Sequence, residues 1–257
     1  MLWRILDSPH SILGSIHILP DGALLPSWFP GDLVGVQRAF FESDFRNPAA
    51  GAIGLDYSAA HLQWPGVADA YKRGEALLAS YGIKDPFDAL RPWRVAFYIL
   101  SRLMPFIGVS HEKGADNLLR TMAEAANIEV GFLEQPTRAF DLLDSSCSSV
   151  SGGLPFLENV LNSLISGEGA SDLHRIVHAW LKTDLADLAA LHEEKLRQFP
   201  FMFVPLIQQR NHEWAGVAKK LVGDSKPTLF VVGSLHTVGA GSFLEELAAQ
   251  GIRCSKA

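Results

Sequence analysis

Hydrophobic side chains form short β-type runs near both ends of the chain, whereas the middle shows helical spacing. Residues 2–6 and 11–18 are rich in strand-forming side chains and flank the turn-prone Asp7-Ser8-Pro9-His10 segment, which predicts a β-hairpin. Further strands are predicted at residues 39–45, 128–133, 228–234 and 252–255. We therefore expect the strands of one sheet to come from both ends of the chain and from one segment between them.

Apolar residues elsewhere recur at intervals of three and four, as on one face of a helix. Short helices are expected at residues 33–39, where Asp32 would be the N-cap, and at residues 115–126, which Asp116 would start. A helix start or bend is expected at Pro200 and at Pro205. The other predicted helices are 67–81, 85–103, 137–145, 155–165, 171–182, 186–198, 202–221 and 242–250.

These elements predict an α/β fold with a mixed, mostly parallel sheet. The strand at 13–17, the helix at 33–39 and the strand at 40–44 would form a β-α-β unit, whose two strands are parallel. We expect a single domain over residues 1–257, with a large helical insertion as a cap at about 137–222. Its core strands are expected in residues 1–45, 128–134 and 228–256.

Composition supports a folded core and excludes several classes of protein. The chain has 257 residues, of which 48% are hydrophobic and 19% charged, so disorder is not expected. The net charge is −6 and no basic stripe is present, which argues against a nucleic-acid partner. Cys147 and Cys254 lack Cys-x-x-Cys spacing, so neither a disulfide framework nor a zinc knuckle is predicted.

The N-terminus lacks the basic start, long apolar run and small-residue cleavage site of a signal peptide. No uninterrupted apolar run reaches the ~18 residues expected of a membrane-spanning helix. The sequence therefore predicts a cytoplasmic protein with no membrane span, unless a leader has been removed. It carries no signal for a particular oligomeric state.

One short motif occurs twice, near opposite ends of the chain. Gly14-Ser15-Ile16-His17 and Gly233-Ser234-Leu235-His236 each follow an apolar strand and share the form Gly-Ser-apolar-His. The glycine allows the backbone to turn sharply or to pass close to a neighbour. Ligands of open α/β sheets bind beyond the carboxyl ends of parallel strands. We therefore expect the two strands to deliver two imidazoles to one place.

Two acidic residues, Glu42 and Glu134, also fall at predicted strand ends. Two imidazoles and a carboxylate suit a divalent metal ion and leave positions open for water and substrate. Other interpretations remain open at this point. Glu42 could be a solvated strand end, with Asp44 as its competitor, and Glu134 could cap a helix before Pro136.

Arg210 and Asn211 form the other notable pair, on a predicted helix. Facing inward, they could hold a carboxylate or an anionic intermediate. Helical spacing alone favours an exposed face instead. The chain contains no His-Glu-x-x-His motif, Gly-x-Ser-x-Gly elbow, phosphate-binding loop or dinucleotide fingerprint.

In the order and spacing of these motifs, the chain resembles the TraB/PrgY/GumN proteins, which are related to the Tiki metalloproteases. It is most similar to the GumN branch. The resemblance covers nearly the whole chain. It departs from the family pattern at Ser15 and Ser234, where Thr or Ala is usual, and at His111-Glu112. The segments that carry it are 13–20, 41–44, 113–116, 131–135, 210–215 and 231–239.

This resemblance implies a fold similar to erythromycin esterase and to a haem-binding lipoprotein branch. The family's two Gly-x-x-His motifs match His17 and His236, its acidic positions match Glu42 and Glu134, and its arginine matches Arg210. It implies a manganese- or cobalt-dependent peptidase, although zinc would also suit these ligands. The expected supporting residues are Gly14, Gly233, Asp116 and Asn211.

Three alternative functions are compatible with these motifs and this resemblance. The first is a metal-dependent hydrolase, foremost a peptidase, which would use His17, His236 and either Glu42 or Glu134 to hold the ion. The other carboxylate would move the proton, and Arg210 would stabilise an oxyanion or hold a substrate carboxylate. Its substrate would be a peptide or a small molecule.

The second function keeps the fold but replaces the metal with a histidine general base, as in erythromycin esterase. The third is not enzymatic: the protein would bind haem or another ligand, or act as a regulator. Aromatic side chains are available for a haem cleft, although such side chains are more typical of a core; they are Trp93, Phe97, Tyr98 and Trp180.

Overall fold

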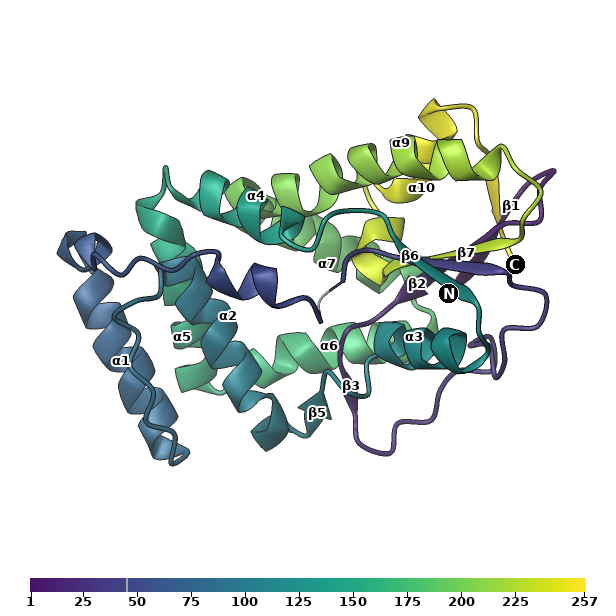
Figure 1. Ribbon diagram of the computed structural model, residues 1–257. Helices are drawn as coiled ribbons and strands as arrows, with labels where there is room; N and C mark the ends of the chain where they lie inside the picture. The colour runs from purple at the N-terminus through teal and green to yellow at the C-terminus, as the bar shows by residue number, and fades with distance from the viewer. Residues whose placement is uncertain (45) are drawn as a thin grey trace. The chain divides into compact units, whose positions relative to one another are not determined.

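The computed structural model describes residues 1–44 and 46–257 (Figure 1). The chain divides into two compact units. The first contains Met1–Arg46, Val109–Pro136 and Ile176–Ala257. The second contains Asn47–Gly108 and Thr137–Arg175. The helical stretch predicted at 137–222 is thus shared between the two units.

A six-stranded sheet forms the centre of the first unit. Its strands lie in the order β6-β4-β7-β2-β1-β8. The neighbours from β6 to β2 pair in parallel, whereas β1 is antiparallel to both β2 and β8. The fold is therefore α/β with a mixed, mostly parallel sheet, as predicted. The strands are β1 (Leu2–Ile5), β2 (Ser11–Ser15), β4 (Arg38–Phe41), β6 (Glu129–Phe132), β7 (Thr228–Gly233) and β8 (Cys254–Lys256).

The two Gly-Ser-apolar-His motifs meet because β2 and β7 are neighbours. Gly14 lies opposite Val232, and Ser15 lies opposite Gly233. All six residues of β7 are buried, since this strand has a neighbour on each side and a helix packed on it. Phe243, for example, packs against Phe230 with ring centroids 6.5 Å apart. Strands from the two ends of the chain therefore form the middle of one sheet.

The helix predicted at residues 33–39 is absent. Asp32 Oδ1 accepts a hydrogen bond from the Val34 amide instead of capping a helix, and Gly35 adopts a left-handed conformation with φ +82°. The chain turns there and enters β4 at Arg38. The helix of the predicted β-α-β unit is therefore wrong. Its two strands, β2 and β4, are parallel as predicted, but β7 lies between them. Phe45, the end of the strand predicted at 39–45, lies outside the described residues.

Helices lie on both faces of this sheet (Figure 1). One face carries α3 (Ala115–Ala125), and the other carries α9 (Arg210–Val222) and α10 (Phe243–Ala249). The first unit also contains α7 (Leu185–Gln198), α8 (Pro200–Phe203), the two-residue strands β3 (Leu19–Pro20) and β5 (Val109–Ser110), and part of α6 (Gly169–Lys182).

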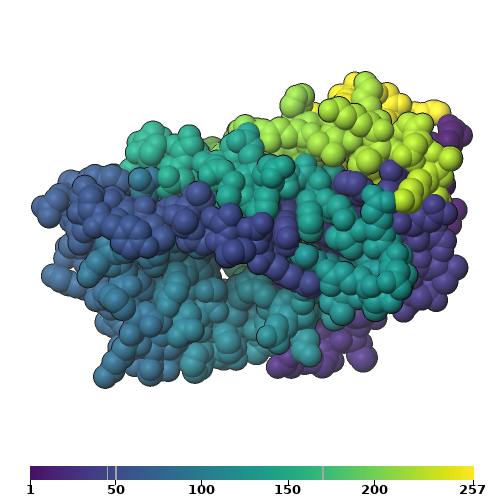
Figure 2. All heavy atoms as spheres, viewed as in Figure 1, coloured from purple at the N-terminus to yellow at the C-terminus, as the bar shows by residue number. Residues whose placement is uncertain are grey.

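The helix predicted at 202–221 is interrupted. A π-helical segment, Val204–Gln209, separates α8 from α9, and it contains Pro205, which has no N–H for the helical ladder. The outer face of α9 carries Lys219 and Lys220, and its atoms, coloured yellow-green, form part of the visible surface of the first unit (Figure 2). Its inner face is buried and includes Arg210, Asn211 and Trp214.

The second unit is helical and has a hydrophobic core of its own. The helix predicted at 85–103 begins only at Pro92, because proline suits the first helical turn and disfavours helix in the residue before it. Its helices are α1 (Val67–Ser80), α2 (Pro92–Leu103), α4 (Arg138–Cys147) and α5 (Leu154–Ser166).

Among residues 1–44 and 46–257, every helix is too short or too polar to cross a bilayer. Cys147 and Cys254 are both free thiols. This agrees with the sequence, which predicts neither a membrane-spanning helix nor a disulfide framework.

Candidate active site

His17 and His236 both approach one carboxylate, that of Glu42. The Nε2 atom of each imidazole is 3.9 Å from Glu42 Oε1. Glu42 directly follows β4, His17 follows β2 and His236 follows β7. Because these three parallel strands are adjacent, their carboxyl ends bring the three side chains to one edge of the sheet.

Each imidazole is oriented through its other ring nitrogen. His17 Nδ1 lies 2.8 Å from Asp116 Oδ2, and His236 Nδ1 lies 2.7 Å from Asn211 Oδ1. The Asn211 amide is itself held, since its Nδ2 donates to the Gly241 carbonyl at 2.8 Å. These partners turn both Nε2 atoms toward Glu42, an arrangement that metal-binding histidines commonly adopt.

Asp116 reaches His17 because the chain passes very close to it at Gly114. A Cβ atom on Gly114 would lie 2.4 Å from the His17 carbonyl oxygen. The Ala115 amide donates to the Ile16 carbonyl at 2.7 Å, which ties the start of α3 to the end of the first motif. The helix α3 begins at Ala115, and its N-cap is Gly114, not Asp116. The Asp116 side chain binds His17 instead of capping the helix.

Both motif glycines lie in closely packed surroundings. The Gly233 amide donates to Glu42 Oε1 at 2.5 Å, and a Cβ on Gly233 would lie 3.1 Å from that oxygen. A Cβ on Gly14 would lie 3.2 Å from the Trp3 ring and 3.4 Å from Thr237 Oγ1. The two glycines therefore allow the paired motifs and Glu42 to approach one another.

Arg210 joins the two candidate carboxylates. Its Nη2 atom lies 2.9 Å from Glu42 Oε2 and 2.8 Å from Glu134 Oε1, and its Nε atom lies 2.9 Å from Glu134 Oε2. All three side chains are buried. The interpretation of Arg210 and Asn211 as an exposed helix face is therefore wrong. Glu42 is not a solvated strand end, and Glu134 does not cap a helix.

Asp44, the competitor of Glu42, lies outside this cluster and pairs with Arg120 at 2.7 Å. Among the described acids, Glu42 is the one that faces both imidazoles, whereas Glu134 stands behind it and contacts Arg210. The structure thus gives the two candidate carboxylates different environments, which the sequence left open.

Trp214 is a site residue that the sequence reasoning missed. Its Nε1 atom donates to Glu134 Oε2 at 2.9 Å, and the Arg210 guanidinium lies 4.4 Å from the centre of its ring. The ring of His236 packs against it with centroids 4.6 Å apart. Trp214 follows Arg210 by four positions on α9, so helical spacing placed it on the same face.

The charges of the site follow from its burial and its partners. Burial opposes a charge on His17, but the Asp116 and Glu42 carboxylates outweigh it and raise the pKa of His17 from 6.5 to about 9. Burial lowers the pKa of His236 to about 3, so this imidazole is neutral. Burial would raise the pKa of Glu42, yet His236, Arg210 and His17 hold it at about 2. The pKa of Glu134 is raised by burial, against the effect of Arg210.

The donor set fits a divalent metal ion in its chemistry and orientation. Two Nε2 atoms and one carboxylate oxygen converge, and each imidazole has a partner on Nδ1. The spacing is somewhat wide, because ligand atoms about 2.1 Å from one tetrahedral ion are roughly 3.4 Å apart. Accordingly, the described part of the chain contains no three His, Cys, Asp or Glu side chains already spaced as metal ligands.

The site is partly exposed at His17. The His17 side chain is 43% exposed, whereas those of Glu42 and His236 are 4% and 6% exposed.

The aromatic residues considered for a haem cleft include two fully buried tryptophans. Trp180 Nε1 donates to the Gly14 carbonyl at 2.8 Å, and Trp93 Nε1 donates to Asp144 Oδ1 at 3.0 Å. Both indoles are core residues with their N–H groups satisfied, which favours the core interpretation.

The comparisons with known proteins give one match. The model of the TraB/PrgY/gumN family matches residues 1–256, which is almost the whole chain. No curated protein and no solved structure matches the chain.

Proposed function

The chain belongs to the TraB/PrgY/gumN family, and we propose that it is a metal-dependent hydrolase, foremost a peptidase. The observation that carries this proposal is the placement of both Nε2 atoms 3.9 Å from the same Glu42 oxygen, with both Nδ1 atoms bonded to oriented partners. His17, His236 and Glu42 would hold the ion. Manganese and cobalt are the expected metals, and zinc is compatible with the same ligands.

A divalent ion, when bound, lowers the pKa of water and polarises a scissile carbonyl. Asp116 and Asn211 hold the two imidazoles in the orientation that this task requires. Arg210 and the Gly233 amide keep Glu42 ionised and aimed at the imidazoles. Each of these groups acts before a substrate arrives, so the site is preorganised.

Glu134 and Arg210 take supporting roles in this proposal. Glu134 receives two donors from Arg210 and one from Trp214, and its side chain is only 3% exposed. Arg210 directs its donors to the two carboxylates and to the Leu206 carbonyl. It therefore acts on Glu42 instead of on a substrate oxyanion, and Glu134 acts by holding Arg210.

A metal-independent hydrolase is the second candidate, and the His17–Asp116 pair favours it. An exposed imidazole with a carboxylate on Nδ1 is the arrangement of a histidine general base. A base must be neutral, and so must an imidazole that binds a metal ion through Nε2, so the raised pKa of His17 opposes both functions equally. A single general base does not need a second imidazole, whereas a metal ion does use one, and His236 Nε2 is 3.9 Å from the same Glu42 oxygen. The metal-dependent function therefore stays in first place.

Ion binding and peptide cleavage test the proposal together. Mn²⁺, Co²⁺ and Zn²⁺ are titrated calorimetrically into the wild-type protein and into His17→Gln, His236→Gln and Glu42→Gln variants. The matched control is His212→Gln, because His212 is an exposed histidine whose partner is Glu246. We expect one ion per chain in the wild type and the control, and none in the three site variants.

The same proteins are then incubated with a peptide library before and after chelation. Cleavage that requires the added ion supports the metal-dependent function. Full cleavage after exhaustive chelation favours the histidine-base alternative. Absence of ion binding by the wild-type protein would sink the proposal.

A further inference from the structure

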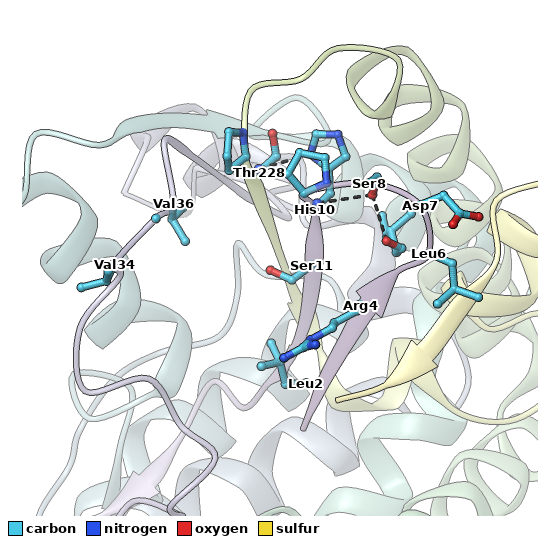
Figure 3. A pocket seen from close by; sticks show the side chains of 14 residues that line it. Leu2, Arg4, Leu6, Asp7, Ser8, His10, Ser11, Val34, Val36 and Thr228 are labelled. Atoms are coloured by element: carbon cyan, nitrogen blue, oxygen red, sulfur yellow. Dashed lines mark hydrogen bonds between the residues drawn. The ribbon is translucent and has the colours of Figure 1, made fainter.

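A pocket lies in the first unit, at the edge of the sheet where β2 and β7 begin. The candidate active site lies at the other edge, where these strands end. The pocket has a volume of about 550 Å³, within the range of small-molecule sites. None of the candidate active-site residues lines it. Figure 3 shows Arg4 and Ser11 on the strand side, with Val34 and Val36 across the pocket.

The floor of this pocket carries a row of polar side chains with one positive charge. Arg4 on β1 lies directly opposite Ser11 on β2 and Ser255 on β8. Directly opposite residues of antiparallel strands point to the same face of a sheet. Arg4 and Ser11 both line the pocket, so a guanidinium and a hydroxyl group are available to a ligand there. These donors suit a carboxylate, to which arginine can donate two parallel hydrogen bonds.

No described acid neutralises Arg4. Within the part of the chain that the structure describes, no carboxylate lies at ion-pair distance from its guanidinium. Asp7, the acid of the pocket lining, is 3.6 Å from Arg253. An unpaired arginine is notable in a chain whose net charge is −6, because acidic residues outnumber basic ones.

The lining also contains apolar side chains that are open to solvent, together with the polar Asp7, Ser8, His10 and Thr228. Val34 is 85% exposed and Leu6 is 41% exposed, and Leu2 and Val36 also line the pocket. A ligand that covers these side chains would bury apolar surface, which is favourable. The pocket thus combines the positive charge of Arg4 with apolar side chains such as Val34 and Val36.

We propose that this pocket binds a small carboxylate with an apolar tail, its carboxylate on Arg4 and Ser11 and its tail against Leu2, Val34 and Val36. The inference is independent of the proposed hydrolase, because the two sites share no residue and lie at opposite edges of the sheet.

The test is an NMR titration of the ¹⁵N-labelled full-length protein with three probes. Hexanoate has both the charge and the tail, acetate has only the charge, and 1-hexanol has only the tail. We expect hexanoate to shift the amide signals of Ser11, Gly35 and Val36 in a saturable manner, and the other two probes to bind more weakly.

The variants Arg4→Gln and Arg4→Lys identify the recognising group. Arg4 is exposed, so its replacement leaves the core intact. We expect Arg4→Gln to weaken hexanoate binding about tenfold, and Arg4→Lys to bind with intermediate strength because it keeps the charge without the planar fork. Arg197→Gln is the control, since it removes the same charge from an exposed position on α7. Absence of saturable shifts, equal binding of hexanol, or unchanged binding by Arg4→Gln would each overturn the proposal.

Discussion

Arg210 Nη2 lies 2.9 Å from Glu42 Oε2, and both side chains are buried at the carboxyl edge of the sheet. The same nitrogen contacts Glu134, so one guanidinium binds two buried carboxylates at once. This ion cluster holds Glu42 between the two imidazoles of the Gly-Ser-apolar-His motifs.

Replacing Arg210 with Met leaves two buried carboxylates without their cation. We expect the free energy of unfolding to fall by about 3–5 kcal/mol, as when one partner of a buried ion pair is lost. Urea denaturation measures this loss. The control is Arg46→Met, which breaks an exposed pair with Glu124 and should cost less than about 1 kcal/mol. Equal losses in the two variants would contradict the role assigned to Arg210.

Asp116 is expected to make stability depend on pH through His17. The folded pKa of His17 is about 9, above its ordinary value of 6.5, because Asp116 and Glu42 outweigh burial. Protonated His17 therefore stabilises the fold fully below about pH 6.5, and this contribution is lost as the pH rises through 9. In Asp116→Asn we expect a lower pKa for His17 and a smaller loss of stability over this window.

NMR titration of the His17 side chain and urea denaturation at several pH values measure both effects. Glu246→Gln serves as the control, because it removes the partner of the exposed His212 and should leave the pH dependence nearly unchanged. A His17 pKa that stays at its wild-type value in Asp116→Asn would rule out this coupling.

Gly233→Ala should damage the site directly. The added Cβ would lie 3.1 Å from Glu42 Oε1, 3.5 Å from His236 Cδ2 and 3.6 Å from His17 Nε2. We expect Mn²⁺ affinity to fall by about tenfold or more, because the groups around the ion must shift. The matched control is Gly216→Ala on α9, where no atom lies within 4 Å of the new Cβ and helix propensity favours alanine. Calorimetry that gives the same Mn²⁺ affinity for Gly233→Ala and the wild-type protein would contradict the expected crowding by the added Cβ.

Trp214→Phe separates the role of Trp214 in the site from its role in the core. It keeps an aromatic ring beside Arg210 and His236 but removes the donor to Glu134. Trp93→Phe removes an equivalent indole donor to Asp144 in the second unit. We expect both variants to lose about 1–2 kcal/mol of unfolding free energy, and only Trp214→Phe to weaken Mn²⁺ binding. An equal loss of Mn²⁺ affinity in Trp93→Phe would show that Trp214 has no separate role in the site.

Local patterns predicted much of the first unit. The hairpin predicted at residues 2–6 and 11–18 is formed by β1 and β2, with β2 ending at Ser15. The strand predicted at 228–234 appears as β7, which ends at Gly233 and has every residue buried. The same reasoning failed at residues 33–39, where a left-handed Gly35 and the turn made by Asp32 replace a helix. It also missed the π-helical segment before Arg210, because apolar spacing alone does not report how a proline alters the hydrogen-bond ladder.

By itself, the sequence determined the strand-ending motifs that carry His17 and His236 and the acids that follow two other strands. Such features are local, since they depend on runs of apolar side chains and on the residues that end them. Only the tertiary structure decided which acid faces the imidazoles. Glu42 does so because β4 pairs with β7, whereas β6 lies one strand farther out and places Glu134 behind Arg210. Strand order and the docking of α9 depend on contacts between distant segments, and no local pattern of residues encodes them.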